Sequence, residues 1–338
     1  MMTETTVGRP GRPSPREIRA ALGRASTGRR GDAVWAILVG GCAVGILLLV
    51  LAITTLMVVE SWPAVQRFGF GFIVGQRWDP VGGHFGALPF LYGTVVSSVL
   101  ALLIGGPVAL GSAIALSELV PRQLRGLLSA LVELLAAIPS VVYGLWGIFV
   151  LAPLLRSAVE PALRTALGFL PLFSGPAYGV GTLAGGLILA IMILPTIAAV
   201  SRDALLAVPN DQREAMLALG ATHWEMVWGA VVPYARTGIL GGFILGLGRA
   251  LGETMAVTMV IGNRPAISAS LFAPSYTLAS VIANEFTEAT SDLHLAALVE
   301  IGLVLLGVAV VVNALARLLI WQIERAGGSA AAGPGRGR

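Results

Sequence analysis

Six long apolar runs constrain this chain more than any other feature of its sequence. They cover residues 34–59, 88–117, 127–154, 178–200, 237–261 and 293–320. About 20 consecutive apolar residues let an α-helix cross the hydrocarbon core of a bilayer. A helix also satisfies its backbone hydrogen bonds internally, as that medium requires. The runs therefore predict an all-α integral membrane protein with six transmembrane helices.

The composition supports a membrane protein and excludes one kind of activity. Only 12% of the 338 residues are charged, whereas a soluble globular domain carries about 25%. All 22 basic residues are arginine, and the sequence contains no lysine. A P-loop needs a lysine on the nucleotide phosphates. If ATP drives this protein, another chain hydrolyses it, and we expect no ATPase activity in this chain.

Cysteine and histidine usage gives no indication of a metal site. Cys42 is the single cysteine and lies inside the first apolar run, so no disulfide can form within the chain. The three histidines, His84, His223 and His294, are far apart in the sequence. We therefore predict neither a metal site nor a cofactor.

The arginine distribution predicts an orientation. With the N-terminus in the cytoplasm, the cytoplasmic segments contain 16 arginines and the external segments contain five, while Arg249 lies inside a predicted span. Cytoplasmic loops of membrane proteins are enriched in basic residues. Both termini are therefore predicted to be cytoplasmic.

The composition also predicts how the chain is divided. Residues 1–32 are rich in Arg, Pro, Gly, Ser and Thr, and residues 326–338 in Gly, Ala and Arg. We expect disordered tails at 1–32 and 321–338 because neither segment can bury enough apolar surface. The first span and its external loop occupy 33–87. The main membrane domain occupies 88–320 and includes a long cytoplasmic loop at 201–235.

That loop is expected to contain two short helices joined by a turn. Pro209 and Asn210 suit the start of the first helix. Gly220 suits the left-handed position just past its end. Thr222 and Glu225 have the spacing of a capping box for the second helix.

Pro233 is expected to end the second helix before the fifth span. An ordinary amphipathic hairpin would account for these signals. The segment also contains Glu214, Ala215, Gly220 and Pro233. Their spacing resembles that of the EAA loop of ABC importer permeases. The departures from that pattern are all apolar substitutions, at Met216, Ala230 and Val232. In that family the loop docks on an ATPase subunit, so the resemblance implies that Glu214, Ala215 and Gly220 contact an ATPase.

Small and charged residues share one face of the predicted helix 237–261. With 3.6 residues per turn, one wedge about 80° wide holds Gly238, Gly242, Gly246, Arg249 and Glu253. Glycines at this spacing permit close helix approach, so the charged residues are expected on the packed face.

Arg249 and Glu253 are spaced to pair along one helix. Two interpretations remain open from the residues alone. The pair holds neighbouring helices in register, or Arg249 meets an anionic substrate, because a guanidinium group suits oxyanions.

A second resemblance bears on the substrate. The run GLGRALGETMAV at 246–257 resembles that of the C-type permease subunit of phosphate-specific ABC importers. The similarity covers roughly residues 70–320 and includes IPSVVYGLWGIFVLAP at 138–153, WDP at 78–80, YGT at 92–94 and LPTI at 194–197. In that family the residues that match Arg249 and Glu253 are implicated in moving phosphate, so the resemblance implies a substrate path there.

The family resemblance also implies partners and a location. It implies a type I ABC importer permease fold in the bacterial inner membrane, with this chain forming half of a translocation path. The expected partners are a homologous A-type permease, two copies of an ATPase, an external phosphate-binding protein and the lipid bilayer. No nucleic acid is expected.

Two rival functions share some of these features. A permease for another oxyanion, sulfate or molybdate, would have the same loop. An ATP-independent secondary transporter or channel would not need it.

Two further acidic residues are expected to be buried. Glu133 and Glu300 lie in the third and sixth predicted spans, where each is expected to hydrogen-bond a neighbouring helix or line the path. Close to Glu133, Pro139 cannot donate to the carbonyl of Leu135. Such a break is tolerated where a neighbour or a cavity satisfies the backbone.

Overall fold

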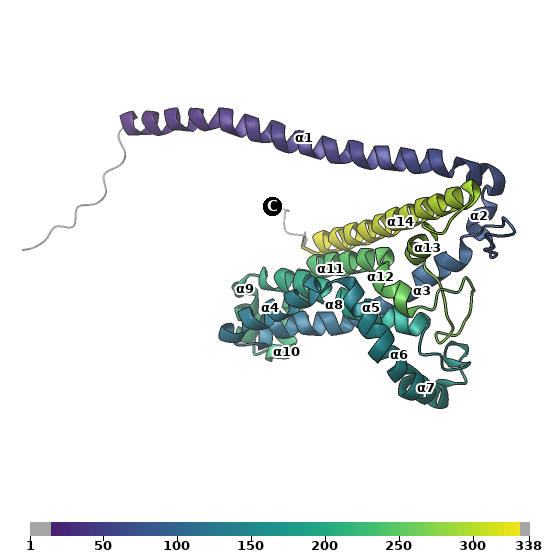
Figure 1. Ribbon diagram of the computed structural model, residues 1–338. Helices are drawn as coiled ribbons and strands as arrows, with labels where there is room; N and C mark the ends of the chain where they lie inside the picture. Colours follow the sequence, from purple (N-terminus) through teal and green to yellow (C-terminus); the bar gives the residue numbers. More distant parts are fainter. Residues whose placement is uncertain (1–14, 332–338) are drawn as a thin grey trace, which may run out of the picture. The chain divides into compact units, whose positions relative to one another are not determined.

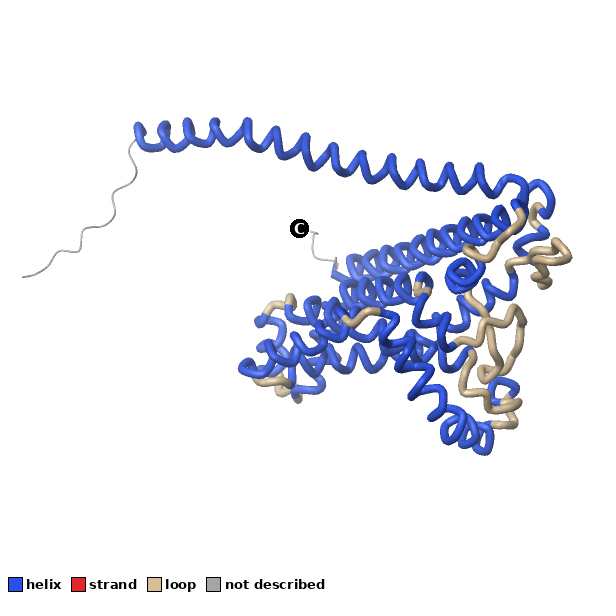
Figure 2. Tube along the Cα trace, in the orientation of Figure 1, coloured by secondary structure: helices blue, strands red, loops and turns tan. Residues whose placement is uncertain are grey.

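The computed structural model describes residues 15–331 of the chain (Figure 1). Helices make up nearly all of its regular structure (Figure 2). Within the described residues, β-type pairing is limited to an isolated bridge between Asp79 and His84. The predicted all-α class is therefore confirmed.

Most of the helices follow one another with short connections, and the longer ones precede α3, α8 and α13. The α-helices are α1 (Pro15–Phe68), α2 (Gly71–Val74), α3 (Leu88–Ile114), α4 (Arg122–Ala137), α5 (Ser140–Trp146), α6 (Ala152–Leu154), α7 (Glu160–Leu167), α8 (Thr182–Leu206), α9 (Asn210–Ala218), α10 (His223–Met226), α11 (Val232–Gly252), α12 (Met255–Val260), α13 (Leu278–Glu285) and α14 (Asp292–Ala331). Four π-helical turns extend or join them, η1 (Ala115–Leu119), η2 (Gly147–Leu151), η3 (Leu155–Val159) and η5 (Val227–Val231), and η4 (Pro171–Phe173) is a 3₁₀ turn.

Six helices in the described part of the chain are long and apolar enough to cross a membrane, as predicted. They are Ala33–Phe68, Leu88–Leu119, Ser140–Leu167, Thr182–Leu206, His223–Gly252 and Asp292–Gln322. The third differs from the expected range 127–154. Pro139 separates α4 from the helical run that starts at Ser140, because a proline restricts the preceding residue to extended backbone.

Within the described residues, two segments predicted to be disordered are helical. Residues 15–32 were expected to be disordered, but α1 begins at Pro15. Proline suits a first helical turn, and the apolar span already provides the nucleus from which a helix extends at low cost. Similarly, α14 continues to Ala331, and the Arg325 guanidinium lies 3.5 Å from the ring centre of Trp321 one turn earlier. Residues 1–14 and 332–338 lie outside the described part of the chain.

The chain divides into two units, and the boundary follows Leu56 inside α1. Within the larger unit, α8 is the central helix and packs against α3 and α11. The α3 contact is close: a Cβ added at Gly105 would lie 2.8 Å from the carbonyl oxygen of Ala190 on α8. Helices α9 and α10 lie at one end of this unit, and the longer loops lie at the other, here called the loop end (Figures 1 and 2).

The glycine stripe of the fifth span faces α8, which confirms the close approach predicted from its spacing. A Cβ at Gly238 would lie 2.4 Å from the Cβ of Ala204, and one at Gly246 would lie 2.6 Å from Cγ1 of Ile197. Real Cβ atoms do not approach so closely, so α11 can reach α8 only because these positions are glycine.

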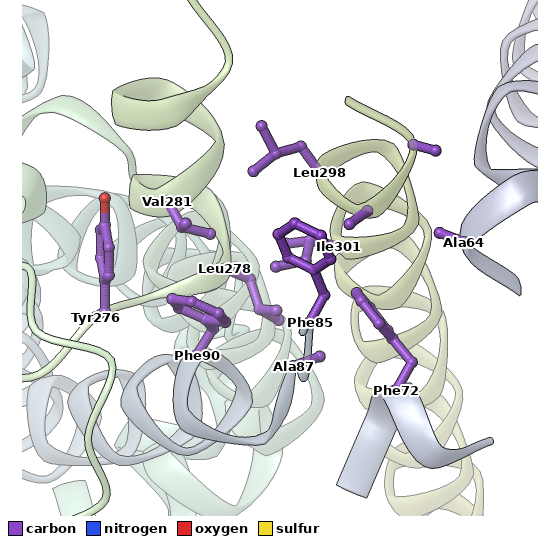
Figure 3. Packing of buried hydrophobic residues seen from close by; sticks show 12 residues of the cluster. Ala64, Phe72, Phe85, Ala87, Phe90, Tyr276, Leu278, Val281, Leu298 and Ile301 are labelled. Atoms are coloured by element: carbon purple, nitrogen blue, oxygen red, sulfur yellow. The ribbon is translucent and has the colours of Figure 1, made fainter. Parts of the chain in front are cut away.

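An aromatic cluster holds the loop end together. Buried side chains from the segment before α3, from α3, from α13 and from α14 point toward one another (Figure 3). Trp78 packs edge-on against Phe85 and Phe90, with ring centres 4.8 and 4.9 Å away. Its indole Nε1 donates to Glu285 at 2.8 Å, and Nε2 of His294 lies 3.1 Å from the same carboxylate oxygen. The cluster therefore joins the end of α13 to the start of α14.

The glycine stripe gives a first prediction. Gly238→Ala should lower the free energy of unfolding by about 1–3 kcal/mol, the usual cost of overpacking. Gly241 lies on the same helix, and a Cβ added there would meet nothing within 4 Å, so Gly241→Ala should leave stability unchanged or raise it by up to about 1 kcal/mol through helix propensity. Thermal unfolding in detergent compares the two variants. Equal unfolding temperatures would contradict the stripe's role.

The buried phenol of Tyr276 gives a second prediction. Burial raises its pKa from 10.0 to about 12. The neutral phenol therefore contributes stability that is fully present below pH 10 and is lost as the pH rises through about 12. A difference titration of phenolate absorbance, wild type minus Tyr276→Phe, should rise near pH 12. A midpoint near pH 10 would contradict the burial.

Candidate functional site

The fifth span is broken where its charged residues lie. A continuous helix was expected over 237–261, but α11 ends at Gly252 and Glu253 has extended backbone, with φ −69° and ψ 130°. A new helix, α12, starts at Met255. One oxygen of the Glu253 carboxylate accepts from the backbone N–H of Ala256 at 3.3 Å. Glu253 thus stabilises the start of α12 instead of continuing α11.

The predicted pairing of Arg249 with Glu253 is wrong. Within the part of the chain that the structure describes, these two side chains form no ion pair. The physical reason is the break, because pairing four residues apart requires an uninterrupted helix. Both residues are half-buried.

The helix predicted over 127–154 is also interrupted, just before the observed third span begins at Ser140. Ile138 and Pro139 are extended between α4 and α5. The carbonyl of Leu135 accepts from the Tyr143 hydroxyl at 2.8 Å and from the Ile138 N–H at 3.4 Å. The expectation that a neighbour satisfies this carbonyl is confirmed. Sequence reasoning did not single out Tyr143, although its place one turn after the proline was a usable signal.

Helices α5 and α12, each of which follows one of the breaks, lie against each other. Gly144 on α5 approaches α12 so closely that a Cβ would lie 2.5 Å from Sδ of Met259 and 3.1 Å from Cα of Ala256. Beside this contact is an apolar recess of about 300 Å³, lined by Ile138, Val142, Tyr143, Trp146 and Ile191. Irregular backbone at membrane depth is expected only where protein covers it or where it lines a path.

The loop between the fourth and fifth spans has the predicted hairpin. Helix α9 starts at Asn210 after Pro209, and Gly220 has φ +85°. Thr222 and Glu225 form the expected capping box at the start of α10. The residues predicted to contact an ATPase, Glu214, Ala215 and Gly220, are all exposed.

Pro233 does not end the second helix, contrary to expectation. It occupies the first turn of α11, which follows α10 through η5 without interruption. A proline is tolerated in a first helical turn, and the π-helical turn precedes it directly. The fifth span therefore starts at His223, and α10 is its first turn.

Arg213 is the anchor of α9, and sequence reasoning did not single it out. Its guanidinium donates to both carboxylate oxygens of Glu118, at 2.8 and 3.3 Å, and to the carbonyl oxygens of Leu205 and Val208. The Arg213 side chain is 15% exposed and that of Glu118 is 5% exposed. Because Glu118 lies 95 residues away in the chain, no local pattern predicts the pair.

The two other acidic candidates differ from each other. Glu133, expected to be buried, has a 59% exposed side chain on α4 and forms an ion pair of 3.3 Å with Arg202 on α8. Glu133 is exposed because α4 ends before Pro139 and is not part of the third span, which starts at Ser140. Glu300 is buried as predicted, and its Oε2 has no hydrogen-bond partner among the described residues.

This architecture defines a class of protein. The described residues contain six membrane-length helices, extended backbone just before the third and just after the fifth of them, and an exposed helical hairpin at one end, which together are the features of a membrane permease. Residues 105–324 match the family of binding-protein-dependent transport system inner membrane components, which is well over half of the chain. The chain belongs to this permease family.

Curated relatives extend the match over most of the chain. The phosphate transport system permease protein PstC of Mesorhizobium japonicum is 46% identical over 297 residues, which cover 87% of this chain and 91% of the relative. The protein of the same name from Pasteurella multocida is 48% identical over 287 residues, 84% of this chain and 89% of its own length. These relatives confirm the resemblance inferred from the motifs.

A solved structure supports the fold. The crystal structure of a bacterial ABC transporter involved in the import of the acidic polysaccharide alginate contains a chain with a TM-score of 0.53 and 14% identity, covering 86% of this chain and 97% of that one. The likeness agrees with the predicted type I importer permease fold. It carries no information about the substrate of this chain.

Tyr143 gives a third prediction. Tyr143→Phe removes one of the two hydrogen bonds that the Leu135 carbonyl accepts and should cost about 1 kcal/mol of stability. Because this bond holds the break, uptake of the transported solute should also fall. Tyr92→Phe is a matched control, since the Tyr92 hydroxyl donates to the carbonyl of Ser268 at 2.6 Å, outside the breaks. Thermal unfolding and uptake are measured on both variants. Equal uptake by the two would contradict a role for the break.

Proposed function

We propose that this chain is the permease subunit of an ATP-driven phosphate importer and forms half of its translocation path. The assignment of phosphate as the substrate rests on the similarity to phosphate transport permeases, which are 46% and 48% identical over more than four fifths of the chain. The permease acts in the inner membrane with the other subunits of a binding-protein-dependent system. It would itself break no bond.

In this proposal, Arg249 meets phosphate on the path. It is the half-buried arginine in the last turn of α11, next to the break at Glu253. A guanidinium offers paired donors in a plane that match two oxygens of an oxyanion. Because no carboxylate pairs with it among the described residues, its donors are available to a substrate.

Glu253 has a different part from the one expected of an ion-pair partner. Its carboxylate caps α12, and it therefore maintains the break beside Arg249. Its negative charge, four residues from Arg249, also limits how strongly the site retains an anion. An importer needs this limit on anion binding, since a substrate held too tightly would not leave the path.

The hairpin of α9 and α10 is proposed to dock on a separate ATPase. Glu214, Ala215 and Gly220 are exposed there, and the chain lacks the lysine that a P-loop of its own would require. We infer two copies of that ATPase, a homologous A-type permease and an external phosphate-binding protein as partners. The arginine distribution favours cytoplasmic termini and a cytoplasmic hairpin.

Arg249→Gln tests the path. Two charge-assisted hydrogen bonds contribute about 1.5–3 kcal/mol each, so uptake of radiolabelled phosphate should fall by roughly a hundredfold or more while the complex still assembles. Arg77→Gln is the matched control, because the Arg77 side chain is 72% exposed at the loop end. Normal phosphate uptake by Arg249→Gln would sink the assignment.

A further inference from the structure

Helix α9 is attached to the membrane domain in an unusual way. None of its nine residues is buried, and its apolar attachment is the half-buried Met216, which packs against the buried cluster next to η5. The half-buried Arg213 side chain makes four hydrogen bonds to other segments. Arg213 is therefore the polar attachment of α9, and its bonds transmit movement of this helix to the segments that accept them.

The acceptors of Arg213 belong to the ends of two spans. Leu205 is in the last turn of α8, and Val208 follows that helix by two residues. The last carbonyls of a helix lack its regular internal partners. The Leu205 carbonyl accepts from the Val208 N–H at 3.3 Å, and the guanidinium adds a side-chain donor there and at Val208. Glu118 is in η1, the π-helical turn that extends α3. One side chain therefore joins α9 to both α3 and α8.

The geometry makes this junction stiff. Arg213 binds Glu118 through two nitrogens, Nε and Nη2, and these side chains are only 15% and 5% exposed. Water screens such a pair little. By contrast, the Glu133 partner of Arg202 is 59% exposed. Two parallel bonds also fix the angle between the groups, which a single bond does not.

Close packing continues from this junction to the proposed path. α3 approaches α8 at Gly105 and Ala190, and α8 approaches α11 at Ala204 and Gly238. α11 carries Arg249 in its last turn. Tightly packed helices do not deform continuously and so shift as units, which makes this series of contacts a physical route between α9 and the break.

We propose that Arg213 is the positioning residue that transmits movement of α9 to the ends of α3 and α8, with Glu118 as its fixed partner. This inference rests on the proposed function, since it supposes that an ATPase moves α9. Without the junction, α9 would move on its own. ATP would be hydrolysed, but the path would not switch with it.

The test uses the whole complex, this chain with its co-encoded transport subunits, reconstituted in lipid vesicles. Phosphate uptake and ATP hydrolysis are measured on the same vesicles for Arg213→Gln, Glu118→Gln and the double variant. Allosteric couplings amount to roughly 5- to 150-fold, so phosphate moved per ATP hydrolysed should fall by that order in each single variant. The double variant should be no worse, because both changes remove one junction.

Two further variants separate coupling from folding. Arg213→Lys keeps the positive charge opposite Glu118 but lacks the paired donors of a guanidinium. Its ratio of uptake to hydrolysis should therefore lie between those of the wild type and Arg213→Gln. Arg77→Gln removes an ion-paired but 72% exposed arginine and should leave the ratio unchanged.

The outcomes distinguish the two proposals. Wild-type complex that shows neither phosphate uptake nor ATP hydrolysis would overturn the proposed function itself. If the wild type transports phosphate and the single variants keep its ratio, the role of Arg213 is overturned. The same holds if uptake and hydrolysis fall in equal proportion, or if neither variant complex assembles, since either result would give Arg213 a purely structural part.

Discussion

The need to satisfy backbone hydrogen bonds inside a bilayer governs this structure. A helix meets that need by itself, and each departure from helix has an identifiable replacement. Pro139 has no N–H to donate to the carbonyl of Leu135, and the Tyr143 hydroxyl donates to this carbonyl instead. Where α11 ends, the Glu253 carboxylate accepts from the first turn of α12. The two breaks therefore exist because nearby side chains stabilise them. Since α5 and α12 pack against each other, the breaks also form one region of the membrane domain.

Close packing connects this region to the hairpin of α9 and α10. Lipid provides little hydrophobic force between helices, so glycines that let backbones approach carry much of the packing. Gly105 on α3 and Gly238 on α11 both face α8, which makes α8 the centre of the larger unit. At its end, the carbonyls of Leu205 and Val208 bind Arg213. The same few contacts thus maintain the fold and offer a route for movement.

Local signals in the sequence were sufficient for much of the fold and part of the site. Apolar runs predicted six spans, and the turn residues Gly220 and Thr222 predicted the hairpin. The break at Glu253 was not predicted, because the apolar pattern and the helical spacing of Arg249 continue across it. The Arg213 pair with Glu118 joins residues 95 positions apart, and a single sequence contains no signal for such a contact. Glu133 was wrongly expected to be buried, because the effect of Pro139 on the third span was underestimated.

The central claim is that this permease moves phosphate with the help of an ATPase. Its most direct test is radiolabelled phosphate uptake in a strain that lacks its own phosphate importer and is supplied with this chain and its neighbouring transport genes. Arsenate, sulfate and molybdate serve as competitors. We predict uptake that requires this chain and is blocked by arsenate alone. Absence of phosphate uptake, or competition led by sulfate or molybdate, would contradict the assigned substrate and the role given to Arg249.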